Sequence, residues 1–462
     1  MKKSVIFVII ALVIIVGVVG YIYFSGDKFV VEDEEWFQKE NTLEITQFQA
    51  KTSEELEDNH MGRMLQADIY SERHLNYFLD EVNELGLTRI RLSFDWFDWD
   101  EAEDKGVYST HFIDPNQIEA IKKLDEKGIK IVYTLIFWDE TIDTETEGEE
   151  YSKFKTEEEI QNYLDYVQFI VSNLKGYVDY YEILNEPNHC EGTQQNVKID
   201  DYINLVKRVV PVIQQEDPEA KIIIGAVSDL RQTEPEEYFL GLIESEIMTL
   251  ADGISFHSMY GTSPDYEALK QYYYDYPSFI QGIKSTSSSN GFTGEYLVDE
   301  MCWRTARNPH PDESWIYTEI TAAKYYARGI IINLGLGLIA GMGELESGDN
   351  LPKMKVVKNL ATIMAGATPT NLEIEIQSQA TNIEYYTFSL SNGDKLIVLW
   401  TDGVAVDDDA GVNADLTSSE LNGKQSVAVD VLEGYEQNLI VEENTINDLI
   451  VRDYPLVIYI NS

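Results

Sequence analysis

The chain of 462 residues is poor in basic side chains: 34 Lys and Arg stand against 82 Asp and Glu, and the formal net charge is −48. Nucleic-acid-binding proteins neutralise phosphates with Lys and Arg, so this deficit excludes that class. The same charge keeps the surface soluble and repels anionic substrates. A net charge this negative has two explanations. The protein could be adapted to a salty exterior, where ions screen the repulsion between its acidic groups, or it could be an exported protein whose composition has become acidic without such adaptation.

Cysteine is almost absent, with only Cys190 and Cys302 in the chain. Two cysteines are too few for a disulfide scaffold or a cysteine-rich metal site. In an oxidising compartment they could form one disulfide if their Cα atoms lie within about 7 Å, and two buried thiols are the alternative. The six histidines lack the spacing of metal ligands, so neither a metal nor another cofactor is expected.

A long hydrophobic run occurs only at the beginning of the chain. Residues 5–24 form an apolar stretch after Lys2 and Lys3, and about 20 residues suffice to cross a bilayer. The stretch does not end in a small-x-small cleavage site, which favours an uncleaved anchor over a cleaved signal. We therefore expect a transmembrane segment over 1–25 and a tether over 26–42. The two lysines would stay cytoplasmic, which places the remaining chain on the extracellular side, or makes it secreted if the segment is cleaved.

Glycine-rich phosphate loops are missing too, because neither G-x-G-x-x-G nor G-x-x-x-x-G-K occurs. Their absence argues against a doubly wound open sheet. Between 43 and 366, segments of helical period alternate with short apolar runs typical of buried strands. Seven runs can be placed, at 88–94, 129–136, 178–184, 221–225, 253–256, 295–299 and 336–340. With an eighth run within 43–65, the pattern predicts a (β/α)8 TIM barrel.

The last part of the chain, from 367 to 462, has a different pattern. Short runs of strand composition are separated by turns such as Ser391-Asn392-Gly393-Asp394. Closely spaced strands with turns of this kind are typical of antiparallel sheets. We therefore expect a small C-terminal antiparallel β-sandwich domain packed on the barrel.

Two glutamates stand at the ends of predicted barrel strands. Glu186 comes shortly after the run 178–184 and precedes Pro187. Glu300 directly follows the run 295–299. Active sites of such barrels lie at the carboxyl ends of the strands, so the two carboxylates should share a cleft. A pair of carboxylates is what glycoside hydrolysis requires. Asp299 is a rival to Glu300, and because adjacent strand residues point to opposite sides, only one of them should face the cleft.

The segment Asn185-Glu186-Pro187 after a hydrophobic strand, followed later by Asp299-Glu300 and Trp303, resembles the clan A glycoside hydrolases. Families 39 and 5 are the most similar, and the resemblance covers about 60–462. It implies a retaining (β/α)8 enzyme in which Glu186 is the general acid/base and Glu300 the nucleophile. Glu186 should be held protonated, while donors such as Arg91 and Tyr260 keep Glu300 ionised.

The resemblance and the strand-end positions together give a set of expected substrate-binding residues. They are Asn185, Arg91, His257, Tyr260, Trp303, Trp138 and Trp96. In such enzymes the Asn bonds the sugar 2-hydroxyl, the Tyr holds the nucleophile and the Arg lies beneath it. Aromatic side chains present flat apolar faces with polar tips, which suits sugar rings, although any one Trp could equally be barrel packing.

One departure leaves the substrate open. Strand eight usually carries a Trp beneath the sugar, whereas 337–346 offers Met342, Glu344 and Glu346. We expect a retaining β-glycosidase or endo-glycanase that acts on an oligo- or polysaccharide. The alternatives are a catalytically inactive, membrane-tethered carbohydrate-binding protein and a transglycosylase on the same scaffold.

Overall fold

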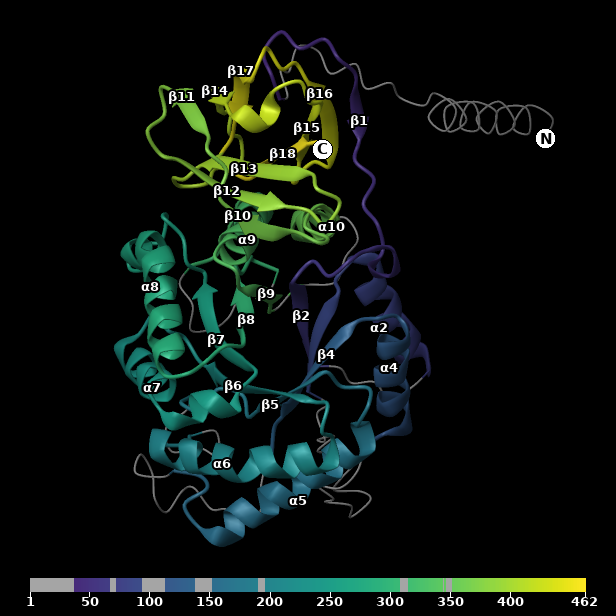
Figure 1. The fold of residues 1–462 in the computed structure, drawn as a ribbon, viewed down its shortest axis with the longest axis vertical. Coiled ribbons are helices and arrows are strands. Elements are labelled where there is room, and N and C mark those ends of the chain that lie inside the picture. The colour runs from purple at the N-terminus through teal and green to yellow at the C-terminus, as the bar shows by residue number, and fades with distance from the viewer. Residues whose placement is uncertain are drawn as a thin grey trace, which may run out of the picture.

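A computed structural model describes residues 37–66, 72–93, 113–137, 152–189, 196–307, 315–343, 345 and 351–462. Its centre is a closed barrel of eight parallel strands (Figure 1). They are β2 (Met61–Gln66), β3 (Arg89–Ser93), β4 (Lys130–Leu135), β5 (Tyr180–Ile183), β6 (Lys221–Val227), β7 (Gly253–Tyr260), β8 (Glu295–Cys302) and β9 (Ile339–Met342). The predicted barrel is confirmed, and the strand that the sequence could not place is β2.

Helices surround the barrel on its outside (Figure 1). They are α2 (Glu72–Glu84), α4 (Pro115–Glu126), α5 (Glu157–Leu174), α6 (Ile199–Glu216), α7 (Thr233–Ile243), α8 (Lys270–Ser289), α9 (Glu319–Gly335) and α10 (Pro352–Ile363). Helix α5 shows why they form. Thr156 and Glu159 make a capping box at its start, and Ile160, Val167 and Ile170 repeat along its buried face.

The C-terminal part forms two antiparallel sheets. The first has the strand order β1-β16-β15-β18-β13-β12-β10, and the second β11-β14-β17. Their bounds are β1 (Ile45–Gln47), β10 (Thr368–Thr370), β11 (Glu375–Ser378), β12 (Ile383–Ser389), β13 (Lys395–Thr401), β14 (Val412–Thr417), β15 (Ser426–Asp430), β16 (Tyr435–Leu439), β17 (Thr445–Val451) and β18 (Leu456–Ile460). Side chains from both sheets, such as Leu399 and Leu449, share one buried core. The predicted antiparallel domain is therefore present, and we call it the β-domain.

The β-domain also takes in residues that precede the barrel. Strand β1 pairs with β16, Gln38 pairs with Leu449, and Phe37 is fully buried in the β-domain core. The sequence analysis placed 26–42 in a tether and began the barrel at 43. A three-residue edge strand has too few residues to show a period-two pattern, which is why it was missed.

Helix α9 joins the barrel to the β-domain. All its residues from Thr321 to Leu334 are buried, because it lies between the two (Figure 1). Arg328 donates hydrogen bonds to the carbonyl oxygens of Asp453, Gly403 and Thr401. The Nζ atom of Lys324 lies 2.7 Å from Oδ1 of Asp453. Two buried cations of the barrel thus hold the β-domain through its loops.

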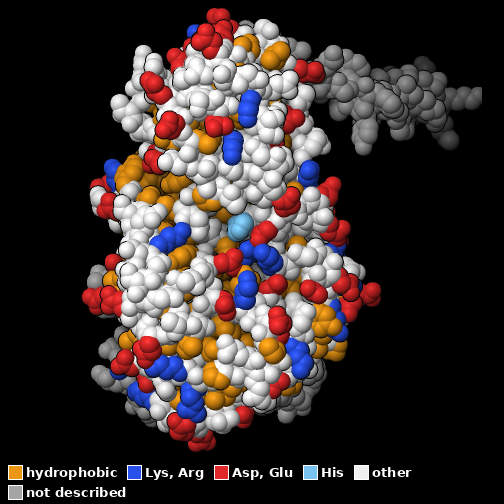
Figure 2. Space-filling view, in the orientation of Figure 1, with side chains coloured by type: hydrophobic (Ala, Val, Ile, Leu, Met, Phe, Trp, Pro, Cys, Tyr) orange, Lys and Arg blue, Asp and Glu red, His pale blue; other side chains and the backbone are white. Residues whose placement is uncertain are grey.

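Acidic side chains are spread over both the barrel and the β-domain, with Lys and Arg among them, on the face shown in Figure 2. The described part of the chain contains no helix that is both long and apolar enough for a bilayer. The predicted anchor over 1–25 lies outside the described residues and stays a prediction. Cys190 also lies outside them, whereas Cys302 is buried in the barrel, so both alternatives for the two cysteines, a disulfide and two thiols, stay open.

Candidate active site

Glu186 lies just beyond the carboxyl end of β5, in a turn with unusual backbone angles. Leu184 has φ 66° and Glu186 has φ 45°, both in the left-handed region. For residues other than glycine this conformation costs on the order of 1–3 kcal/mol and is concentrated at functional sites. The Glu186 N–H donates to the carbonyl of Ala226 at 2.9 Å, which fixes the turn against β6.

Glu300 lies on β8, where the register of the sheet changes. Phe256 pairs with Val298, but the next residue, His257, pairs with Glu300, so Asp299 is an extra residue in β8. This is a β-bulge, which re-aims side chains at the edge of a barrel. Tyr260 donates from its hydroxyl to Oε2 of Glu300 at 2.5 Å.

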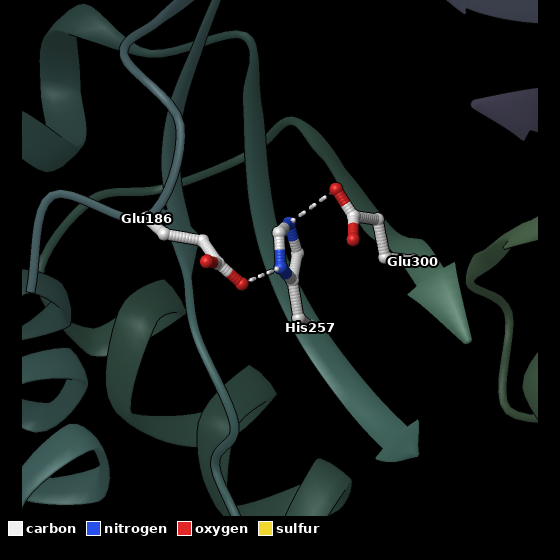
Figure 3. Close-up of side chains that lie close together, drawn as sticks. All are labelled: Glu186, His257 and Glu300. Atoms are coloured by element: carbon white, nitrogen blue, oxygen red, sulfur yellow. Dashed lines mark hydrogen bonds and ion pairs between the residues drawn. The ribbon is translucent and has the colours of Figure 1, made fainter. Parts of the chain in front are cut away.

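His257 lies between the two glutamates (Figure 3). Its Nδ1 is 2.7 Å from Oε1 of Glu186, and its Nε2 is 3.5 Å from Oε1 of Glu300. Oxygens of the two carboxylates come within 4.8 Å of each other. Retaining glycosidases hold their carboxyl groups about 5–5.5 Å apart, and inverting ones about 6.5–9.5 Å. An oxygen–oxygen approach within 4.8 Å is shorter than the inverting range.

A positive charge on His257 is favoured by its neighbours. Burial alone would lower the pKa of His257, but the neighbouring acids, Glu300 foremost and Glu186 through its hydrogen bond, raise it to about 9. Burial likewise favours the neutral form of Glu186, but the hydrogen bond and charge of His257 lower the pKa of Glu186 below its ordinary value. These directions are opposite to the expectation of a protonated Glu186: they favour a carboxylate at Glu186 and the proton on His257.

Arg91 connects most of the site. It donates from Nη1 to Oε1 of Glu300 at 2.8 Å, from Nη2 to Oδ1 of Asn185 at 2.7 Å, and from Nε to Oε2 of Glu182 at 2.7 Å. Burial would lower the pKa of Arg91, but the carboxylates of Glu182 and Glu300 raise it, so the guanidinium stays charged. Burial also raises the pKa of Tyr260 well above its usual range, which keeps its hydroxyl a donor.

The structure thus brings together Glu186, Glu300, Asn185, Arg91, His257 and Tyr260. Trp303 does not join them. Its ring is only 1% exposed, it packs 5.1 Å from the ring of Tyr326, and its Nε1 donates to Thr262 O. In this position Trp303 fills the core and offers no open face to a sugar. Trp96 and Trp138 lie outside the described residues.

Three residues at the site were not singled out from the sequence. Glu182 is fully buried within β5, and an acid flanked by Tyr181 and Ile183 in a strand run is a signal that could have found it. Arg231 has its guanidinium 5.7 Å from the ring of Tyr260 and 5.6 Å from the ring of Trp315. Arg231 and Trp315 are the other two residues that were missed. No sequence pattern marks them, because they reach the site from loops.

Glu186, His257 and Glu300 lie close enough to hold a cation. Each of them already has a partner, however. Arg91 and Tyr260 donate to the two oxygens of Glu300, and Nδ1 of His257 shares a proton with Glu186. A metal ion would have to displace the charged guanidinium, so the arrangement suits proton transfer better than metal binding.

No protein-family model matches the sequence, and no curated protein is similar to it in sequence. Solved structures with the same fold are numerous. A family 39 glycoside hydrolase from Bacteroides cellulosilyticus has a TM-score of 0.64 at 17% identity, covering 89% of this chain and 82% of that one. A family 51 α-L-arabinofuranosidase from Bifidobacterium longum has a TM-score of 0.57 at 12% identity, covering 90% and 98%.

A third similar structure is the catalytic domain of the family 30 xylanase C from Talaromyces cellulolyticus, with a TM-score of 0.54 at 12% identity and coverage of 90% and 98%. Family 5 is represented by a structure from Bacteroides vulgatus, with a TM-score of 0.53. The chain therefore has the (β/α)8 fold of these glycoside hydrolases, as the clan A resemblance implied. Identities this low carry the fold and leave the substrate open.

Proposed function

We propose that this protein is a retaining glycoside hydrolase that cleaves β-glycosidic bonds of an oligo- or polysaccharide by double displacement. Glu300 is the nucleophile and Glu186 the general acid/base. The observation that carries the proposal is the pair of carboxylates on β5 and β8 whose oxygens approach within 4.8 Å. Donors on both oxygens of Glu300 keep it ionised, which a nucleophile needs.

In the first step an oxygen of Glu300 attacks the anomeric carbon and the bond to the leaving oxygen breaks. That oxygen takes a proton from Glu186, which receives it from His257 across the 2.7 Å contact. The side-chain carbonyl oxygen of Asn185 accepts a hydrogen bond from Arg91, which leaves its amide N–H groups to donate to a sugar hydroxyl. The product is a glycosyl ester on Glu300.

In the second step Glu186, now a carboxylate, takes a proton from water while the water oxygen attacks the anomeric carbon and releases Glu300. Esterification has removed the negative charge of Glu300, so His257 and Glu186 both hold a proton less tightly than before. Glu186 is therefore deprotonated at this stage and available to accept a proton from water. An acceptor sugar in place of water would give transglycosylation, and product analysis separates the two outcomes.

The test uses a panel of aryl β-glycosides and polysaccharides with variants of both glutamates. We expect Glu300→Gln to lower kcat/KM by at least about 10³-fold, and Glu186→Gln by about 10²–10⁴-fold, less for activated leaving groups. Glu158→Gln, an exposed glutamate on α5, is the matched control and should behave as wild type.

Azide identifies each role separately. It should rescue Glu186→Ala with a β-glycosyl azide, because the ester on Glu300 still forms, and should rescue Glu300→Gly with an α-glycosyl azide. Wild-type turnover in either glutamine variant would rule out the proposal. Glycan binding without turnover by the wild-type protein would favour the inactive carbohydrate-binding protein instead.

A further inference from the structure

Asp299 lies among the catalytic groups although the mechanism above does not use it. The bulge in β8 lets both Asp299 and Glu300 reach Arg91: Nε is 3.2 Å from Oδ2 of Asp299, and Nη1 is 2.8 Å from Glu300. Asp299 also lies 3.4 Å from Nε2 of His257. The expectation that only one of the two acids faces the site is therefore wrong, because a bulge breaks the alternation of side chains.

The charges of this cluster do not balance if every acid is ionised. Glu182, Glu186, Asp299 and Glu300 are four acids, and Arg91 and His257 are the two bases within contact of them. Even with His257 protonated, the cluster would carry two more negative than positive charges, and a proton on one of its two buried acids, Glu182 or Asp299, leaves one. Burying an unpaired charge is costly, and proteins avoid it by taking up a proton.

The hydrogen bonds indicate which acid takes the proton. Glu182 accepts from Arg91, from the Thr134 hydroxyl at 2.9 Å and from the Ser255 hydroxyl at 2.6 Å, so it is well solvated as a carboxylate. Asp299 is 5% exposed, and neither of its oxygens accepts a conventional hydrogen bond from any described residue. Oε2 of Glu182 and Oδ2 of Asp299 lie 2.7 Å and 3.2 Å from the same Nε of Arg91, so the two carboxyl groups are neighbours, and a hydrogen bond between two acids requires a proton on one of them.

We propose that Asp299 is a positioning residue that remains a neutral carboxylic acid, donates a hydrogen bond to Glu182 and so leaves the charge of Arg91 to Glu182 and Glu300. Burial raises the pKa of Asp299, Arg91 opposes this rise, and the negative charge of Glu182 adds to it, with the net result well above the usual range. Because Asp299 is neutral, Arg91 compensates two carboxylates and not three. Glu300 therefore keeps its hydrogen bond and ion pair with Arg91 while remaining an anion.

This inference rests on the proposed function, and the experiment separates the two. Asp299→Asn keeps the shape, the neutrality and a donor to Glu182, so kcat/KM should stay within about threefold of wild type with an unchanged pH profile. Asp299→Leu removes the donor, and kcat should fall about 10- to 100-fold at unchanged KM, because Arg91 is drawn toward Glu182. Rescue by Asn but not by Leu is the expected pattern.

A second measurement does not depend on activity. The infrared carbonyl band of a protonated carboxylic acid should be present in the wild type at neutral pH and weaken in Asp299→Asn. Loss of activity in Asp299→Asn as deep as in Glu300→Gln, with the infrared band unchanged, would overturn the inference. If azide gave an α-glycosyl product with Asp299→Gly and not with Glu300→Gly, the nucleophile itself would be misassigned, which is a failure of the proposed function.

Discussion

His257 is the residue through which the two halves of the site communicate. Its ring nitrogens contact Glu186 on one side and Glu300 on the other (Figure 3). One proton on this ring decides whether Glu186 can act as an acid. The pH dependence of both catalysis and stability should therefore depend on His257.

The first prediction concerns His257→Gln. In the wild type the alkaline limb of kcat/KM should fall near the His257 pKa of about 9, since above it the shared proton is lost. Gln keeps a hydrogen bond to Glu186 but has no titratable proton to supply, so the limb should move to lower pH. His60→Gln, on β2's amino-terminal side and away from the site, is the control. An unmoved limb in His257→Gln would show that the histidine does not supply the proton.

Stability should follow the same titration. The folded pKa of about 9 lies above the unfolded value of 6.5, so the folded chain binds more protons between these values. The stabilisation is fully present below pH 6.5 and is lost as pH rises through 9, amounting to about 3 kcal/mol. In His257→Gln, the urea midpoint should change less across this window.

Some of the site could be predicted at the scale of residues. Glu186 and Glu300 stand at strand ends beside distinctive neighbours, and Arg91, Asn185 and Tyr260 followed from the resemblance. The position of the proton could not be predicted, because it depends on contacts across the barrel between His257 and acids on other strands. Glu182 was missed for the same reason: its partners lie on β3, β4 and β7.

At the scale of elements, β8 differs most from its sequence pattern. The strand composition of 295–299 predicted its place in the barrel, but an extra residue at Asp299 leaves no mark in the alternation of types. Bulges are fixed by how two neighbouring strands pair, which a single run does not record. The barrel was therefore predictable strand by strand, whereas the direction of the side chains at its rim was not.

The second prediction concerns Trp303, just past the end of β8. Its ring packs against Gly329 of α9, where a Cβ would lie 2.4 Å from Cη2. Trp303→Phe should lower the free energy of unfolding by about 1–3 kcal/mol, through a small cavity and the lost hydrogen bond to Thr262 O, and leave KM unchanged. Urea unfolding and initial-rate kinetics measure the two effects.

Trp315 provides the comparison for this variant. It is partly exposed and lies over Gly261, next to Tyr260. Trp315→Phe should therefore affect KM more than stability. A raised KM with unchanged stability in Trp303→Phe would contradict this prediction and support the substrate-binding role that the sequence predicted for Trp303.

At the scale of the whole molecule, the third prediction concerns the junction between barrel and β-domain. Arg328 is fully buried and donates to three carbonyl oxygens of the β-domain. Arg328→Met would leave these acceptors unsatisfied and should lower the free energy of unfolding by about 2–5 kcal/mol. The wild type should unfold in one calorimetric transition and the variant at a lower temperature or in two.

Arg208→Met is the matched control, because Arg208 forms only an exposed ion pair with Glu157 on the outside of the barrel. Such pairs contribute about 0–1 kcal/mol. An equal loss in both variants would mean that the buried junction contributes no more than a surface contact.

The pairing of β1 with β16 has a consequence for biosynthesis. Gln38 donates to a carbonyl 402 residues further along the chain, and β1 beside it pairs with β16, so this segment gains its partners only after those distant residues are synthesised. At about 5–20 residues per second, translation imposes a delay of roughly 20–80 s. During that time the nascent barrel can fold on the ribosome while β1, which precedes it in the chain, remains unpaired.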